Sequence, residues 1–241
     1  MIPQMIFDQS EYNVRCEWGA SGVQLLAPIS DALIIVDVLS FSTAVEIATS
    51  QGATVFPYRW KDETAYHYAK SVGAEVADKS NPHHRSLSPA SLLNLPSATR
   101  LVLPSPNGST LSLLSGSTPT LLGCLRNCEA AARSALKIGS NIAVIPAGER
   151  WEDGSLRPCF EDLVGAGAVI EFLRGTLSPE AMIARSAFEG ARRNLYVHLT
   201  GCSSGKEKVV RHEESDVKLA SALNASSCVP VLRDGAFLRE A

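Results

Sequence analysis

The 241-residue sequence has no long apolar run, no large excess of one charge and no Cys-X-X-Cys pair. No stretch approaches the roughly 20 apolar residues that span a bilayer, and the N-terminus lacks the basic start and apolar run of a secretory signal. We therefore expect no membrane partner. The net charge of −3 also argues against nucleic-acid binding, because broad nucleic-acid binders carry basic surfaces.

The six cysteines are scattered, and no two of them form a Cys-X-X-Cys motif. Cys124 and Cys128 are four residues apart and could share one face of a helix. Unpaired cysteines are usually small buried side chains, and a scattered set fits a reducing compartment. The sequence therefore predicts a cytoplasmic protein whose core needs no disulfide bonds, since a chain of this length buries enough surface by itself.

What the sequence does contain is a regular alternation of short apolar runs and helical patterns. The run from Ala32 to Val36 has no polar residue, which is typical of a strand buried on both faces. The alternation predicts an α/β protein, and the lack of a repeat or a linker favours one domain over residues 1–241. Strands are expected at 22–27, 32–38, 53–58, 74–77, 100–103, 120–123, 141–146 and 229–232, and helices from 42 to about 52, at 62–72, from 109, and at 126–138, 160–174, 180–189 and 215–223.

Three segments have weaker patterns. Residues 1–21 fit an edge strand or an arm over the domain, and residues 195–211 fit no single type of element. Residues 78–91 contain Pro82 and Pro89 on either side of His83, His84 and Arg85, which predicts a functional or mobile loop.

Asp37 lies at the exit of the apolar run 32–36, and Ser42 or Thr43 is expected to cap the following helix. Open α/β sheets bind ligands at the carboxyl ends of their strands, so this carboxylate is a candidate metal ligand or nucleophile. The alternative is that it caps the next helix or pairs with a basic neighbour. Leu39 stands where haloacid-dehalogenase phosphatases carry a second aspartate, so an aspartyl-phosphate mechanism of that type is not supported.

The turn Ser105-Pro-Asn107-Gly108-Ser109-Thr110 follows another predicted strand and opens a helix. The free N–H groups of a helix N-terminus bind anions, and hydroxyls and glycine allow close approach of a phosphate. The alternative is an ordinary turn between a strand and a helix.

Glu161 and Asp162 begin the predicted helix 160–174, after a loop that contains Arg157. Acidic residues stabilise a helix N-terminus without any further role, but two adjacent carboxylates could also hold Mg²⁺. Arg157 could bind a phosphate or carboxylate through two parallel hydrogen bonds.

The stretch Gly201-Cys-Ser-Ser-Gly205-Lys206-Glu207 looks like a P-loop but is one residue short, and Glu207 replaces the hydroxyl that binds Mg²⁺. We interpret it as a polar turn in which Lys206 could contact an anion, with Arg211 shortly after it.

Taken in order, these motifs resemble the 2-phosphosulfolactate phosphatase (ComB) family. The stretches that carry the resemblance are Val36–Ala44, Ser105–Ser109, Gly123–Asn127, Phe160–Asp162 with Gly165–Gly167, and the C-terminal Gly205, Asp216 and Val229–Gly235. The resemblance implies a three-layer α/β/α fold with a mixed, largely parallel sheet. It also implies Mg²⁺-dependent hydrolysis of a small phosphorylated acid, 2-phosphosulfolactate, to sulfolactate and phosphate.

With this resemblance, the expected roles are as follows. The predicted catalytic and Mg²⁺-binding residues are Asp37, Glu161 and Asp162, and the predicted phosphate- and substrate-binding residues are Ser42, Thr43, Asn107, Gly108, Ser109, Arg157 and Lys206. Ser40 stands where the family usually has an arginine. Two alternatives therefore stay open: a phosphatase for another phospho-acid, and a non-catalytic protein that binds a small phosphorylated or sulfonated metabolite. A homodimer is compatible with the sequence.

Overall fold

The structure is a computed structural model that describes residues 6–78, 80, 83 and 85–240. The main strands are β1 (Val14–Cys16), β2 (Ala32–Val36), β3 (Thr54–Tyr58), β4 (Glu75–Val76), β5 (Arg100–Pro104), β6 (Thr120–Gly123), β7 (Ile142–Pro146), β10 (Pro230–Arg233) and β11 (Ala236–Arg239), and a small ribbon contains β8 (Glu149–Arg150) and β9 (Leu156–Arg157). The helices are α1 (Gly19–Leu26), α2 (Phe41–Ser50), α3 (Thr64–Ser71), α4 (Gly108–Leu114), α5 (Cys128–Ile138), α6 (Phe160–Ile170), α7 (Pro179–Ala191), α8 (Leu195–Gly201), α9 (Ser203–Val210) and α10 (Glu214–Ala220).

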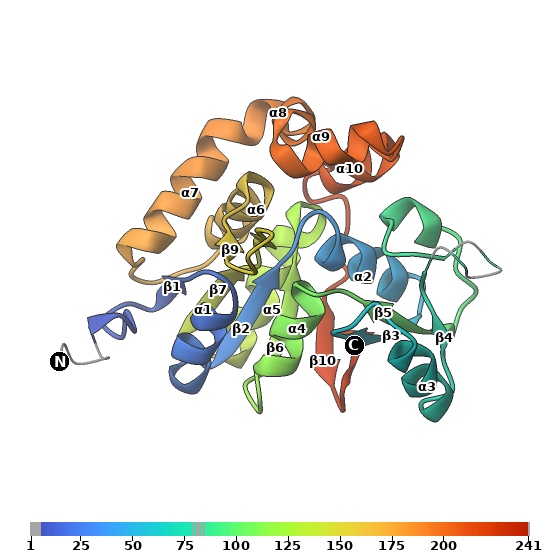
Figure 1. Ribbon diagram of the computed structural model, residues 1–241. Helices are drawn as coiled ribbons and strands as arrows, with labels where there is room; N and C mark the ends of the chain where they lie inside the picture. Colours follow the sequence, from blue (N-terminus) through green and yellow to red (C-terminus); the bar gives the residue numbers. More distant parts are fainter. Residues whose placement is uncertain (1–5, 79, 81–82, 84, 241) are drawn as a thin grey trace.

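Nine strands form one sheet in the order β1-β7-β2-β6-β10-β11-β3-β5-β4, with helices packed on its faces (Figure 1). Two parallel blocks, β1-β7-β2-β6 and β3-β5-β4, are joined by the antiparallel hairpin β10–β11. Asp234 and Gly235 turn this hairpin with φ angles of 50° and 79°, as the tight hairpin turn requires. The prediction of a three-layer α/β/α fold with a mixed, largely parallel sheet is confirmed.

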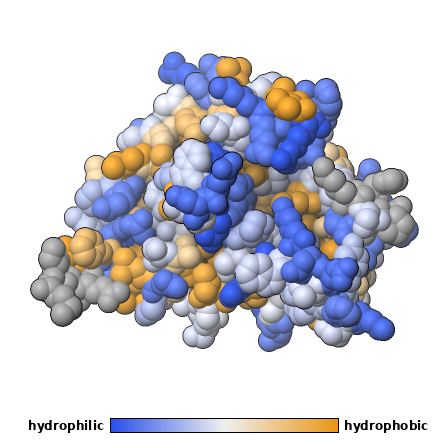
Figure 2. All heavy atoms as spheres, in the orientation of Figure 1, coloured by the Kyte–Doolittle hydropathy of each residue, from blue (hydrophilic) through white to orange (hydrophobic). Residues whose placement is uncertain are grey.

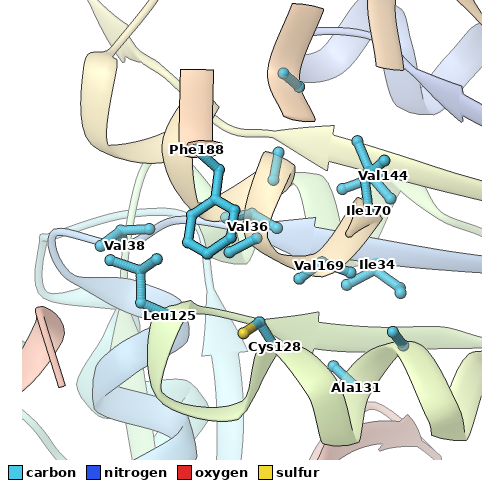
Figure 3. Packing of buried hydrophobic residues seen from close by; sticks show 14 of the residues in the cluster. Ile34, Val36, Val38, Leu125, Cys128, Ala131, Val144, Val169, Ile170 and Phe188 are labelled. Carbon is cyan, nitrogen blue, oxygen red and sulfur yellow. The ribbon is translucent and has the colours of Figure 1, made fainter. Parts of the chain in front are cut away.

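Strand β2 lies in the centre of the core, and all five of its side chains are fully buried. Ile34 and Val36 pack toward α5, α6 and α7, where Figure 3 shows them beside Val169 and Phe188. Leu33 and the other alternate side chains pack on the opposite face, with the apolar residues of α1, α2 and α4. Because both faces of β2 are covered, its sequence has no polar alternation, and the predicted buried strand is confirmed.

The strand predicted at 22–27 is wrong, because residues 22–26 lie within the helix α1 and Ala27 begins a 3₁₀ turn. Gly22, Val23 and Leu26 are buried along one face at helical spacing. A Cβ at Gly22 would lie 2.5 Å from the main-chain oxygen of Glu17, so the helix packs closely on the preceding turn. Six residues, five of them apolar or small, are too few for periodicity to separate a strand from a helix.

The predictions at the two ends of the chain can now be completed. Val14–Cys16 forms the edge strand that was one of two interpretations of residues 1–21. The segment 195–211 forms α8 and α9, which with α10 lie above the carboxyl end of β2 (Figure 1). In the predicted loop 78–91, residues 79, 81, 82 and 84 lie outside the described part, and Pro89–Leu92 forms a short 3₁₀ turn.

Within the described ranges, no helix combines the length and the apolar character needed to cross a bilayer.

Candidate active site

A polar cavity of about 360 Å³, here called the strand-end pocket, opens where β2 and β5 end and α9 covers them. Its lining contains five basic and three acidic side chains. The excess of positive charge suits an anionic ligand, because opposite charges at close range favour each other's ionised form. The charged lining residues are Asp37, Glu149, Glu207, Lys61, Arg150, Arg157, Lys208 and Arg211.

Asp37 follows β2 directly and is 6% exposed. Its two carboxylate oxygens accept main-chain N–H bonds of 3.0 Å from Phe41 and Gly108, the first residues of α2 and α4. Burial, and then the negative charge of Glu149, raise the pKa of Asp37 to about 7, and the two N–H bonds partly oppose this shift. The carboxylate is therefore fixed between two helix N-termini, which favour negative charge.

The hydroxyls of Ser42 and Thr43 do not cap α2, so that prediction is wrong. Ser42 Oγ accepts a bond from the main-chain N–H of Asp37 and donates to the carbonyl of Ile35. Thr43 Oγ1 donates to the carbonyl of Val38 at 2.8 Å. Both side chains are fully buried and do not line the strand-end pocket. Their bonds hold the exit of β2 against the first turn of α2, which fixes the direction of Asp37.

In the turn after β5, phosphate-binding roles were predicted for Asn107, Gly108 and Ser109, and of these only Asn107 lines the pocket. Asn107 lines the pocket, and its Nδ2 donates to Glu149 Oε2 at 2.8 Å. The N–H of Gly108 is bonded to Asp37, and Ser109 Oγ, fully buried, donates to a main-chain carbonyl of β5 at 3.0 Å. A Cβ at Gly108 would lie 2.8 Å from the carboxylate of Asp37, so glycine permits this close approach.

Asp162 connects the exits of β2 and β7. Its Oδ1 accepts the N–H of Val38 and its Oδ2 accepts the N–H of Gly148, both at 2.8 Å. Burial raises the pKa of Asp162 well above its ordinary value, and the charges of Asp37 and Glu161 add to this effect. Both carboxylate oxygens thus support main-chain segments that form the base of the site.

Glu161 completes the acidic group behind the pocket. It is 2% exposed, and its Oε2 accepts a bond of 3.2 Å from the thiol of Cys202. Among the residues that the structure describes, no three acidic, histidine or cysteine side chains are arranged to hold one metal ion. The acidic side chains that line the pocket are Asp37, Glu149 and Glu207, whereas Glu161 and Asp162 do not line it.

Arg157, at the end of the β8–β9 ribbon, lines the pocket. Its Nη2 donates to Ser204 Oγ at 3.4 Å, and its guanidinium lies 5.7 Å from the ring centre of Trp151. These contacts leave the planar group half-buried and oriented, which suits recognition of an oxyanion.

The basic residues of α9 are placed differently from the prediction. Lys206 is exposed and does not line the pocket, whereas Lys208 and Arg211 do. Ser204, Lys208 and Arg211 are spaced by four and three residues, so they share one face of this helix. That helical spacing is visible in the sequence and could have identified Lys208. Lys61 and Arg150 also line the pocket. In the sequence, the one indication of their role is position: Lys61 lies just beyond the strand β3, and Arg150 lies in the loop 147–158.

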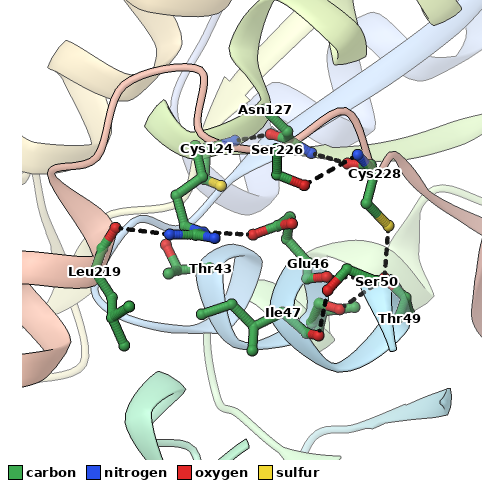
Figure 4. A network of polar contacts seen from close by, with 12 residues as sticks. Thr43, Glu46, Ile47, Thr49, Ser50, Cys124, Asn127, Leu219, Ser226 and Cys228 are labelled. Carbon is green, nitrogen blue, oxygen red and sulfur yellow. Dashed lines mark hydrogen bonds and ion pairs between the residues drawn. The ribbon is translucent and has the colours of Figure 1, made fainter. Parts of the chain in front are cut away.

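The motif Gly123–Asn127 lies outside the pocket lining and has a structural role. Arg126 Nε donates to the fully buried Glu46 at 2.6 Å, and its Nη1 donates to the carbonyl of Leu219 in α10 (Figure 4). Asn127 Nδ2 donates to the carbonyl of Cys228 at 2.9 Å. The motif therefore ties α2, which starts at the pocket, to α10 and to the segment before β10.

Comparison with known proteins gives the same classification as these motifs. The sequence profile of the 2-phosphosulpholactate phosphatase family matches residues 23–235, which is most of the chain. A curated relative, the 2-phosphosulfolactate phosphatase of Methanothermobacter thermautotrophicus, is 27% identical over 209 residues, covering 86% of this chain and 88% of the relative. The matched range contains the exit of β2, the turn after β5, the start of α6 and the basic face of α9. The chain belongs to the 2-phosphosulpholactate phosphatase family.

Proposed function

We propose that this chain is a phosphatase that hydrolyses 2-phosphosulfolactate to sulfolactate and phosphate. The observation that carries the proposal is the strand-end pocket, in which five basic side chains surround the fixed carboxylate of Asp37. The pocket lies within the residues matched by a family named for this reaction, and the curated relative carries the same name. A small acid with a phosphate and further anionic groups matches a pocket with this charge.

The chain's own residues would act mainly by binding and orientation. Arg157 presents two N–H groups to a phosphoryl oxygen, and Lys208 and Lys61 add positive charge from two other walls of the pocket. In phosphoryl transfer the catalytic effect comes almost entirely from positioning and from stabilising negative charge. Asn107, held by Glu149, would donate its remaining amide hydrogen toward the substrate.

We further propose that the reaction depends on Mg²⁺, held by Asp37 with Glu161 and Asp162 behind it. The support is the chemistry of the donors: burial and then nearby negative charges disfavour the charged forms of Asp37 and Asp162, and a divalent cation would relieve this. Mg²⁺ commonly uses one or two carboxylates together with substrate phosphate and water, so three converging protein ligands are not required. When bound, Mg²⁺ would polarise phosphoryl oxygens and orient water.

The test is release of inorganic phosphate from a panel of phosphomonoesters that includes 2-phosphosulfolactate, with Mg²⁺ and with a chelator. We expect the highest kcat/KM for 2-phosphosulfolactate and loss of activity in chelator. Asp37→Asn should lower kcat by at least about 100-fold and abolish the Mg²⁺-induced rise in Tm. Asp153→Asn, in the exposed β8–β9 turn, is the matched control. Near-normal turnover of Asp37→Asn would refute the metal assignment.

Ser40 favours a second candidate, a phosphatase for another phospho-acid or a binding protein without turnover. This side chain is 4% exposed and lines the pocket, and its Oγ has no hydrogen-bond partner. A hydroxyl at this position supplies no charge, so one anionic group of the family's substrate would lose a partner. Calorimetry that shows metabolite binding, with no phosphate release in any divalent metal, would establish the binding protein.

A further inference from the structure

A second cavity adjoins the strand-end pocket and has a different character. This side cavity has a volume of about 480 Å³ and shares Lys61, Leu87, Lys208 and Arg211 with the strand-end pocket. It extends away from Asp37, which does not line it, toward α3 and β4. The strand-end pocket alone has a volume within the range of about 300–1,000 Å³ that is typical of small-molecule sites, so the side cavity is space beyond what a three-carbon acid needs.

The walls of the side cavity are more apolar than those of the strand-end pocket. Ala65 and Tyr66 of α3, Val76 of β4, Leu87 and Pro104 all line it. In Figure 2 hydrophobic side chains show in the recess below the mostly hydrophilic surface of the C-terminal helices. Apolar walls do not replace the hydration of a sulfonate or carboxylate, but they stabilise an apolar group that leaves water.

The charges around the side cavity are balanced. Three basic side chains and three acidic side chains line it, so it has no excess charge to attract a second anion. This differs from the strand-end pocket, where basic residues exceed acidic ones. The six charged residues of the side cavity are Lys61, Lys208, Arg211, Asp62, Asp78 and Glu213.

The boundary between the two cavities is fixed by a buried network. Lys208 Nζ donates to Glu213 at 2.8 Å and to Asp216 at 3.0 Å. Asp216 is fully buried, and its other oxygen accepts the hydroxyl of Ser88 at 2.6 Å and the N–H of Ala90 at 3.0 Å. These bonds join α9 and α10 to the segment that lines the side cavity. Lys208, which lines both cavities, is therefore held in place where they adjoin.

We propose that the two cavities bind two parts of one substrate, a 2-phospho acid with an apolar or aromatic substituent. The phosphate and the carboxylate occupy the strand-end pocket, and the apolar substituent occupies the side cavity. This inference rests on the proposed phosphatase function and extends its substrate class beyond three-carbon acids. Lys208 and Lys61, at the boundary, contact the anionic end from the side that faces the substituent.

A matched pair of esters tests the proposal: 2-phospholactate and 2-phospho-3-phenyllactate, which carry the same phosphate and carboxylate. Burial of even one methylene in an apolar pocket changes specificity by about tenfold or more, so we expect the phenyl ester to have a KM at least about tenfold lower. Ala65→Phe and Ser86→Phe, on different walls, fill the side cavity and should bring the two KM values together. His67→Phe, exposed on the same helix and outside the cavity lining, should keep the preference.

Equal KM values for the two esters in the wild-type protein would overturn the proposal, and so would a preference that survives both filling variants. Thermal melting checks that each variant is folded, and Ser86→Phe provides the result if Ala65→Phe loses stability. If neither these esters nor 2-phosphosulfolactate release phosphate, the phosphatase function fails separately. Calorimetry with the same two compounds then decides: tighter binding of the phenyl ester that the filling variants abolish supports the side cavity, and equal binding refutes it.

Discussion

The buried ion pair between Arg126 and Glu46 allows a quantitative prediction about stability. Glu46 is fully buried, and its Oε1 has no hydrogen-bond partner. Arg126 Nε, 2.6 Å from Oε2, therefore provides the main interaction that offsets the cost of burying this negative charge. Arg126→Met removes that cation but keeps an unbranched apolar side chain of similar reach. Breaking one half of a buried pair leaves an uncompensated charge, which destabilises a protein by about 3–5 kcal/mol.

For a chain of this size, 1 kcal/mol corresponds to a change in Tm of about 2–4 °C, so Arg126→Met should lower Tm by about 6–20 °C. Differential scanning calorimetry and urea unfolding followed by circular dichroism measure this change. Arg133→Met is the matched control, because Arg133 forms an exposed pair with Glu129 one helical turn away. Such a surface pair contributes about 0.3–0.5 kcal/mol.

A second variant separates loss of charge pairing from loss of packing. Replacing both partners, in Glu46→Leu with Arg126→Met, removes the buried charge as well as the cation and should recover most of the lost stability. The reasoning is refuted if Arg126→Met is no more destabilising than Arg133→Met, or if the double variant is as unstable as the single one.

Three further predictions follow from particular residues. Gly108→Ala should lower the free energy of unfolding by about 1–3 kcal/mol, since the new Cβ would lie 2.2 Å from a ring carbon of Phe41. Gly190→Ala in α7 has open space around it and should raise the free energy of unfolding by about 0.5–1 kcal/mol. Urea titrations compare the two variants. Burial, and then a neighbouring carboxylate, raise the pKa of the Cys202 thiol to about 12, so at pH 8 iodoacetamide should label it in unfolded protein far faster than in native protein; equal rates in mass spectra would contradict this. Asp216→Asn removes one of the two carboxylates that hold Lys208 and should raise KM for the phosphate ester roughly tenfold while kcat changes less; a drop confined to kcat would contradict the role.

The central part of the fold could be predicted from the sequence because its pattern is unambiguous. Five consecutive apolar residues before Asp37 are compatible with a strand covered on both faces, and β2 is that strand. Only one strand of the hairpin was predicted: the strand at 229–232 was expected, but β11 was not. Ala236–Arg239 is short and has two exposed residues, so its pairing with β3 in the middle of the sheet depends on contacts that are distant in sequence.

The sequence also predicts only some of the side chains that reach the candidate site. Asp37 and Asn107 each follow a strand, but β2 and β5 belong to blocks that run in opposite directions, so contacts between the blocks, such as the bond from the N–H of Gly108 to Asp37, bring them to one pocket. Arg157 reaches the same pocket from the antiparallel β8–β9 ribbon. The hydroxyls of Thr43 and Ser109 follow the same strands but are bonded to main-chain carbonyls in the interior. Which side chain of a helix's first turn faces the ligand depends on the rotation of that helix, and local sequence does not determine this rotation.

The basic wall of the pocket depends on the part of the chain with the weakest pattern. Lys208 and Arg211 reach the strand ends because α9 and α10 fold back over the sheet, and a buried carboxylate, Asp216, joins these helices to Ser88. A charged residue with no exposure must be paired, so Asp216 constrains the position of Lys208 as well as the position of the helices. The same interaction that stabilises the C-terminal helices therefore orients a basic group toward the pocket, and substitutions in this network should affect stability and substrate affinity together.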